Sequence, residues 1–474
     1  MTINRTRILM GSALKVRLVI GKPADHWLSE EPVKDGYWGF VRCKEDYERE
    51  KSVVCQQIEG LISDLKKERI EIEFLPEIEI QNLDDVLKKF DELKNTAANI
   101  ILGISPLEWC RPEMCSKLIN AITAASKYTI LFDKFGPNIY AGTLFTPPAY
   151  QFLKRHHLVD RVFQVEGDEK KLKTILRSIY ALEKISSARL VCVGPINAEL
   201  GGWPTLKKSI EMFGHDMRFY TYDEFVKDFM EFCEDKNKHG EARKIIEDFV
   251  SKSTKVVEPT EEKLFRAAVY YLVLKKYIRE NEADWITVNC LSELVGKTNA
   301  TPCMAFSIFN DSGIVATCEA DPAAMSLQYL MRYISGKPAF FQDPTVNEKD
   351  GTLILAHCTS PTRLLGFDKP NFPYQVRTHH ESNYGATPKP TFKEGEVTVA
   401  GFSFDLDKML IVKGKVVGTP DLRICRSQVE VKVNNASQIL ENWQGFHWIL
   451  VYGDYIEELK AICKMQGITP LIYE

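Results

Sequence analysis

The chain has 474 residues, of which 45% are hydrophobic and 27% are charged, and its formal net charge is −4. Its length predicts about three domains. The acidic balance argues against nucleic acid as a partner, because no surplus of cations is present to neutralise phosphates. The apolar runs are too short and interrupted for a transmembrane helix, and Lys15 and Arg17 break the apolar stretch near the start. We therefore expect a cytoplasmic protein with no membrane partner.

Twelve cysteines are scattered along the chain rather than clustered. Several of them, including Cys192, Cys290 and Cys318, lie in apolar, strand-like runs. Such positions favour buried free thiols in a reducing compartment over a disulfide framework.

Residues 1–165 alternate between strand and helix patterns. Apolar runs at 16–20, 70–75, 99–103 and 128–132 predict strands, and helical periodicity appears at 45–67, 82–94 and 113–126. This alternation predicts a Rossmann-like α/β domain, with a parallel sheet covered by helices on both faces.

A second α/β set follows over residues 166–338. It begins with a helix at 168–185 and a strand at 189–193, continues with helical stretches from 204 and at 223–251 and 260–280, and reaches a strand at 285–288. Between the first strand and the next helix lies GPINAELGGW. This turn is either a simple strand-to-helix connection or a cradle for a phosphate or sugar at a helix N-terminus.

Residues 339–474 have a different character. Short alternating runs such as GEVTVAGFSFD and KMLIVKGKVVGTP are separated by glycine, proline and aspartate, and a last helix is expected at 455–465. The pattern predicts a β-rich, antiparallel C-terminal domain, either a sandwich or a barrel. The predicted fold is therefore two α/β domains followed by a β-rich domain, with the active site in clefts between them.

The most informative stretch runs from 313 to 361. A β-branched run at 313–318 predicts a buried strand, Glu319 follows it, and Asp321 and Pro322 have the features of an N-cap and a first-turn proline for a helix that ends at Gly336. Glu319 is therefore expected at the carboxyl end of a strand, where open α/β sheets bind their ligands.

Three further residues combine with Glu319. Asp343 follows the apolar pair 340–341, His357 ends a predicted strand at 352–356, and His447 lies in the apolar QGFHWILVY. Each has an ordinary alternative: Glu319 favours a helix start, Asp343 forms a turn before a proline, and each histidine is hydrogen-bonded in the core. Together, two carboxylates and two imidazoles beside apolar runs favour a divalent metal site.

These segments resemble the L-fucose and L-arabinose isomerases. The resemblance rests on CLSELVGKTNATPCMAFSIFNDSGIVATCEADPAAMSLQYLMRYISGKPAFFQDP, then LAHC and NWQGFHW, and is sharpest over 280–360. It implies that Mn²⁺ is bound by Glu319, Asp343 and His447, as in the fucose type, and by His357, as in the arabinose type. It also implies a symmetric homo-oligomer.

The resemblance implies that an aldose and a ketose interconvert through an ene-diol. Glu319 and Asp343 are then the catalytic residues that move protons. Asn442, Trp443, Arg377 and Arg363 are candidates for binding hydroxyls or an anionic substituent, although ordinary packing explains them as well.

The sequence therefore predicts a Mn²⁺-dependent aldose–ketose isomerase of carbohydrate metabolism, with a small sugar as its partner. Two alternatives stay open at this point. One is a non-catalytic sugar-binding or sensing protein on the same scaffold. The other is a metal-dependent sugar lyase or epimerase that uses the same ene-diolate chemistry.

Overall fold

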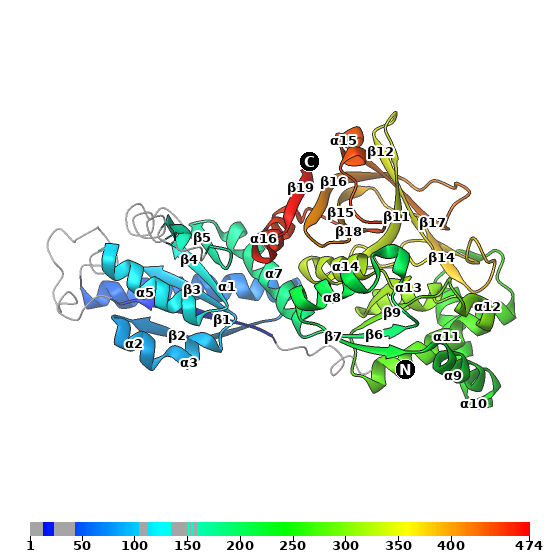
Figure 1. Ribbon diagram of the computed structural model, residues 1–474, viewed down its shortest axis with the longest axis horizontal. Coiled ribbons are helices and arrows are strands. Elements are labelled where there is room, and N and C mark those ends of the chain that lie inside the picture. The colour runs from blue at the N-terminus through cyan, green and yellow to red at the C-terminus, as the bar shows by residue number, and fades with distance from the viewer. Residues whose placement is uncertain (1–12, 23–42, 104–111, 134–149, 152, 156–158) are drawn as a thin grey trace. The chain divides into compact units, whose positions relative to one another are not determined.

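The structure is a computed structural model that describes residues 13–22, 43–103, 112–133, 150–151, 153–155 and 159–474 (Figure 1). The described residues form two compact units, one of residues 13–183 with 464–466, the other of residues 184–463 with 467–474. Within these residues, no helix has both the length and the apolar character that crossing a bilayer requires. The predicted domain boundaries at 165 and 338 stay a prediction.

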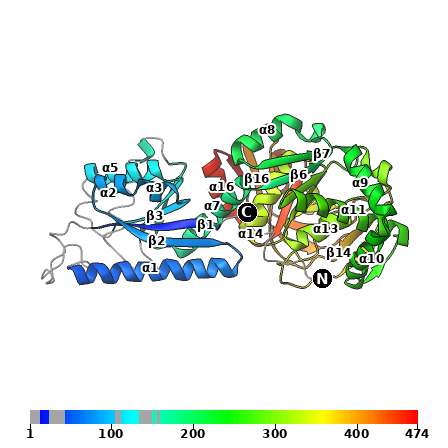
Figure 2. The same cartoon turned by 90° about the horizontal axis from the view of Figure 1, so that it is seen from below.

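The first unit contains a sheet of five strands in the order β2-β1-β3-β4-β5, and every neighbouring pair is parallel. Helix α1 covers one face, and α2, α3 and α5 cover the other (Figure 2). The elements, in chain order, are β1 (Leu14–Gly21), α1 (Lys44–Lys67), β2 (Ile72–Ile80), α2 (Leu83–Lys88), α3 (Phe90–Lys94), β3 (Ala98–Gly103), α5 (Pro112–Ala125), β4 (Tyr128–Asp133), β5 (Val162–Glu166) and α7 (Glu169–Ser186).

The core of this unit forms where strands meet helix α5. Val19, Ile101 and Leu131 pack against Leu118 and Ile122, which are four residues apart and therefore share one face of the helix. The predicted parallel sheet with helices on both faces is confirmed.

The larger unit opens with a second parallel sheet, in the order β10-β9-β6-β7. The predicted helix at 223–251 is in fact two helices, because the Asp235 side chain accepts a hydrogen bond from Asn237 N and starts a new helix. The elements are β6 (Arg189–Val193), η2 (Ala198–Leu200), α8 (Gly202–Phe213), β7 (Asp216–Tyr220), α9 (Tyr222–Glu234), α10 (Lys236–Ser251), β8 (Lys255–Val256), α11 (Glu261–Glu280), β9 (Trp285–Val288), α12 (Leu294–Thr298), α13 (Cys303–Ser312), β10 (Val315–Cys318) and α14 (Pro322–Ser335).

The rest of this unit is a closed antiparallel barrel of six strands, β15-β18-β11-β12-β17-β16, closed by the pairing of β15 with β16. Strand β19 joins β16 in parallel, and β14, β13 and β8 form a small separate sheet. The remaining elements are β11 (Phe340–Asn347), β12 (Thr352–His357), β13 (Tyr374–Arg377), β14 (Thr387–Pro390), β15 (Gly395–Phe402), β16 (Lys408–Gly418), β17 (Ser427–Val433), α15 (Ala436–Glu441), β18 (Trp448–Tyr452), α16 (Ile456–Gln466) and β19 (Thr469–Tyr473). Of the two predicted architectures, the barrel is the one observed.

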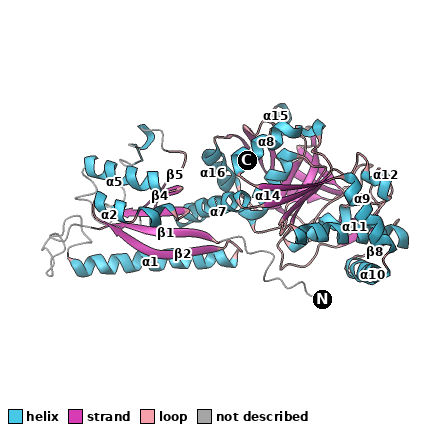
Figure 3. Cartoon of the chain, turned by 60° about the horizontal axis from the view of Figure 1, so that its bottom comes forward, coloured by secondary structure: helices cyan, strands magenta, loops and turns pink. Residues whose placement is uncertain are grey.

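Helix α14 joins the second sheet to the barrel. It contacts β10 and α8 and also the barrel strands β11, β15 and β18. Figure 3 shows α14 beside the strands of the larger unit. Every residue of α14 is buried, as expected for a helix packed between two layers. Asp321 caps its start, Pro322 occupies the first turn, and Gly336 ends it in a left-handed conformation with φ 64°. The helix predicted after Glu319 is confirmed.

A polar network runs through this buried layer. Gln328 of α14 accepts a hydrogen bond from Thr317 Oγ1 at 2.8 Å and donates one to the backbone oxygen of Ala339 at 3.0 Å. Thr317 lies on β10, and its backbone oxygen accepts from Thr287 Oγ1 of β9. The network therefore ties α14 to the sheet and to the start of the barrel.

Gln328→Leu should destabilise the protein because it leaves these buried partners unpaired, at a cost of about 1–3 kcal/mol for each. Urea unfolding followed by circular dichroism measures the free energy of unfolding. Gln438→Leu, at an exposed position on α15, is the matched control and should change that free energy by less than about 0.5 kcal/mol. Equal stability of the two variants would contradict the assigned network.

Candidate metal centre

Glu319 lies in a strained turn between β10 and α14. Glu319 and the next residue, Ala320, both have left-handed backbone conformations, with φ 60° and 50°. Residues other than glycine rarely adopt this region, and such strain concentrates at functional sites. The turn is held by Asn197 of the GPINAELGGW segment, whose backbone N–H donates to the Ala320 oxygen at 3.3 Å. This segment therefore supports the turn that carries Glu319.

Strand pairing brings the other three predicted residues together. Asp343 of β11 pairs with Ala356 of β12, the residue before His357. On its other edge β11 pairs with β18, where Gln342 lies opposite Trp448, the residue after His447. The register of three neighbouring strands thus places one carboxylate and two imidazoles at one end of the barrel.

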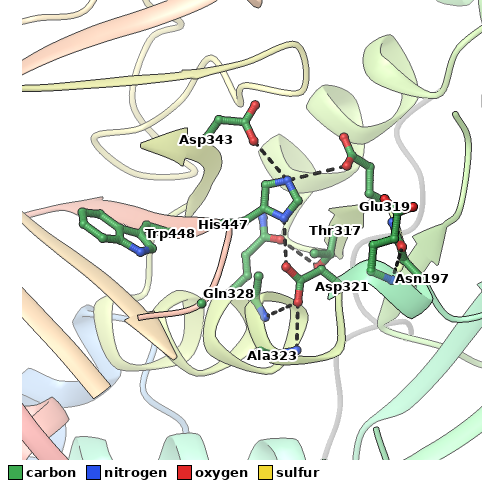
Figure 4. Close-up of polar contacts among 12 residues, drawn as sticks. Asn197, Thr317, Glu319, Asp321, Ala323, Gln328, Asp343, His447 and Trp448 are labelled. Atoms are coloured by element: carbon green, nitrogen blue, oxygen red, sulfur yellow. Dashed lines mark hydrogen bonds and ion pairs between the residues drawn. The ribbon is translucent and has the colours of Figure 1, made fainter. Parts of the chain in front are cut away.

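These three side chains converge on Glu319. Figure 4 shows Asp343, His447 and Glu319 pointing toward one another. His447 Nε2 lies 3.2 Å from Asp343 Oδ1 and 3.6 Å from Glu319 Oε2. His357 Nε2 lies 3.3 Å from Glu319 Oε1. Both imidazoles are buried, while the side chains of Glu319 and Asp343 are 19% and 40% exposed. The carboxylates therefore face the accessible side of the site.

The residues fit a divalent cation. Ligand atoms of Asp343, His357 and His447 lie within 4.8 Å of one another. Among the described residues, His447 Nε2 is buried without a hydrogen-bond partner, although it lies within ion-pair distance of Asp343 and Glu319. A buried nitrogen between two carboxylates has the position of a metal ligand, and oxygen and nitrogen donors suit Mn²⁺ or a similar ion.

Asp321 fixes the orientation of His447. Its Oδ1 accepts the backbone N–H groups of Ala323 and Ala324, which caps α14, and its Oδ2 lies 2.9 Å from His447 Nδ1. A carboxylate on one imidazole nitrogen directs the other nitrogen toward a metal. The sequence predicted Asp321 only as an N-cap; its partner is 126 residues away, so local spacing carried no signal of the second contact.

Aromatic rings and thiols enclose the imidazoles. The Phe341 ring centroid lies 4.1 Å from that of His447 and 4.9 Å from that of His357. Cys318 also lies near Glu319 and His357, but its Sγ is 3.7 Å from Cys290 Sγ. The hydrogen bond with Cys290, followed by burial, raises the pKa of the Cys318 thiol, which keeps it protonated while no metal is bound.

The carboxylates and imidazoles of the site shift one another's pKa in opposite directions. Burial opposes ionisation of Glu319 and Asp343, but the neighbouring imidazoles outweigh it and lower the pKa of both carboxyls. Burial likewise opposes protonation of the imidazoles, but the carboxylates raise the pKa of His357 and raise that of His447 to about 10. A metal bound here would displace imidazole protons, so its affinity should rise with pH.

The predicted substrate-binding residues have protein partners. Arg377 forms an ion pair with Glu258, and Trp443 packs against the barrel core and donates to Gly445 O at 2.8 Å. Asn442 donates to Gln438 O at 3.0 Å and is exposed. Arg363 donates to Phe367 O and Asn371. None of these contacts reaches the four candidate ligands, and their role toward a sugar stays a prediction.

A cluster of carboxylates and buried imidazoles between a parallel sheet and an antiparallel barrel is typical of a metal-dependent enzyme, and we treat it as a candidate for one.

No known family model matches the chain. It is similar to the sulfoquinovose isomerases of Priestia megaterium and Priestia aryabhattai, at 26% identity over 222 residues, or 45% of this chain and 49% of theirs. It is also 22% identical to that of a Clostridium species over 316 residues, or 64% of this chain and 69% of the relative. The chain thus matches about half the length of the two Priestia relatives.

The Asp321 contact predicts a measurable protonation change in metal-free protein. Because the folded-state pKa of His447 is about 10 and its ordinary value is 6.5, the associated stability is complete below pH 6.5 and is lost as the pH rises toward 10. Asp321→Asn should lower this pKa by about 1–3 pH units and flatten the pH dependence of unfolding. NMR of the imidazole protons, with the His447 signal assigned by its loss in His447→Gln, measures this pKa. An unchanged titration in Asp321→Asn would contradict the contact between Asp321 and His447.

Proposed function

We propose that the protein is a Mn²⁺-dependent aldose–ketose isomerase. The observation that carries the proposal is the convergence of Glu319, Asp343, His357 and His447, with Asp321 behind His447. The names of the similar proteins, all sulfoquinovose isomerases, support the reaction type. They also favour a sugar that carries a sulfonate as the substrate.

The proposed roles follow from position. Glu319, Asp343 and His447 would hold the ion, with His357 as the fourth ligand. When bound, the ion supplies the positive charge that holds O1 and O2 of the open-chain sugar and stabilises the negative charge of the ene-diol. Asp321 keeps Nδ1 of His447 occupied, so that only Nε2 faces the site.

The two carboxylates would move the protons. Glu319 is the more enclosed of the two and is ionised at neutral pH, which suits a base that takes the proton from C2 and returns it to C1. Asp343 is more exposed and suits transfer of the hydroxyl proton from O2 to O1. Phe341 covers both imidazoles and limits the access of water from that side.

Glu319→Gln should lower kcat by at least about a hundredfold, because an amide cannot accept the carbon-bound proton. Ketose formation from sulfoquinovose and from uncharged aldoses, measured with Mn²⁺ present, tests this. Glu441→Gln, an exposed carboxylate on α15, is the control and should retain full activity. A wild-type rate in Glu319→Gln would remove the proposed mechanism.

The ene-diol also predicts isotope exchange. In D₂O the sugar recovered from the reaction should carry deuterium at C1 or C2, with no change in its carbon skeleton. Mass spectrometry separates this outcome from cleavage by a lyase and from an unchanged, merely bound sugar.

Metal analysis provides a separate test of the site. Wild type should retain an ion after loading with Mn²⁺, and His447→Ala should lose it. The absence of a retained ion in wild type would contradict the metal centre.

A further inference from the structure

A second charged site lies between three helices of the larger unit. A hollow of about 330 Å³ is lined by residues of α9, α10 and α11, which lie side by side (Figure 1). Its charged lining has four cationic and two acidic residues, and therefore a net charge of +2: Lys238, Lys275, Lys276, Arg279, Glu241 and Glu280. Phe232 and Leu272 give it an apolar part.

Some of the positive charges of this hollow have carboxylate partners and others do not. Lys276 Nζ lies 2.8 Å from Asp228 Oδ2, and Lys238 Nζ lies 2.8 Å from Glu241 Oε1. Arg279 lies in the last turn of α11, where the helix dipole stabilises a positive charge. Lys275 differs, because among the described residues no carboxylate lies within ion-pair distance of its ammonium group.

The surroundings of Lys275 are unfavourable for its charge. The side chain is partly buried, and among the described residues its ammonium makes a favourable but weak cation–π contact, 5.7 Å from the Tyr271 ring centroid. Burial, followed by the positive charges of Arg279 and Lys238, lowers the pKa of Lys275, and Glu241 opposes this only in part. An anion in the hollow would remove this conflict, because it would pair with Lys275 and offset the repulsion from its two neighbours.

The hollow is separate from the candidate metal centre. Lys275 and Arg279 lie on the part of α11 that leads into the start of β9, whereas Glu319 follows the carboxyl end of the parallel strand β10. The two sites therefore lie toward opposite ends of the same sheet. A ligand of the hollow would not share the pocket of the metal.

We propose that this hollow binds a tetrahedral oxyanion, a phosphate or sulfonate group, with Lys275 as its principal contact and Arg279 and Lys238 beside it. The apolar floor formed by Phe232 and Leu272 also suits an anion attached to a small organic body. The proposal concerns a second site and does not depend on the isomerase function.

Titration calorimetry of the full chain with inorganic phosphate, at constant ionic strength, tests the proposal. Wild type should bind phosphate saturably, and Lys275→Met should bind it at least about tenfold more weakly, as expected for the loss of one partly buried ion pair. Lys244→Met, an exposed lysine on α10 outside the hollow, is the matched control and should bind as wild type does. Arg279→Gln, at an exposed position, provides a second weakened variant should Lys275→Met fold poorly.

Two further measurements show where the anion binds and which kind of anion the site prefers. Glu319→Gln should retain wild-type phosphate affinity; if it loses binding while Lys275→Met does not, the phosphate binds at the metal centre and the proposal is overturned. Absence of saturable binding in wild type overturns it as well. A phosphorylated sugar that binds more tightly than phosphate assigns the site to an anionic metabolite, and equal affinity assigns it to the free anion.

Discussion

The contact between Asp321 and His447 is the interaction on which the candidate site depends. One oxygen of Asp321 caps α14 and the other holds an imidazole from the start of β18. A single buried carboxylate therefore connects the second sheet with the barrel. Since the cap fixes where α14 begins, it also fixes the two-residue turn that carries Glu319.

The barrel also constrains the position of His447. Gly445, two residues before His447, has φ 64°, and a β-carbon there would lie 2.1 Å from the backbone oxygen of Phe402 at the end of β15. The loop before β18 is thus held tightly against the barrel, and only glycine fits. His447 is positioned from both directions, by backbone packing behind it and by Asp321 beside it. Such double support fixes the position of the candidate ligand through contacts of the chain itself.

Much of the fold was predictable because it is encoded locally. The strands at 189–193 and 285–288 and the helix after Asp321 have short-range signals, namely apolar runs, an N-cap, a first-turn proline and a closing glycine. The break between α9 and α10 was missed, because Asp235 interrupts an otherwise continuous helical pattern by a single cap. Strand β11 was also missed, since Pro344 after Asp343 is typical of a turn, yet both residues lie within the strand.

The candidate ligands were predictable as residue types, but their arrangement was not. Asp343 and His447 come together through the pairing of Gln342 with Trp448, a barrel register that no local pattern specifies. The role of Asp321 toward His447 has the same origin. Long-range strand pairing and a contact across 126 residues depend on the whole chain, so the sequence could indicate the donors without their geometry.

The two charged clusters of the larger unit differ in how their partly buried charges are compensated. At the barrel, carboxylates lie beside two buried imidazoles, and the opposite charges offset the cost of burial for each other. Between α9, α10 and α11, Lys276 and Lys238 are paired with Asp228 and Glu241, whereas the charge of Lys275 is only partly compensated, by the more distant Glu241. On our proposals, the first cluster exchanges protons for a cation, whereas the second binds an anion that comes from outside the chain.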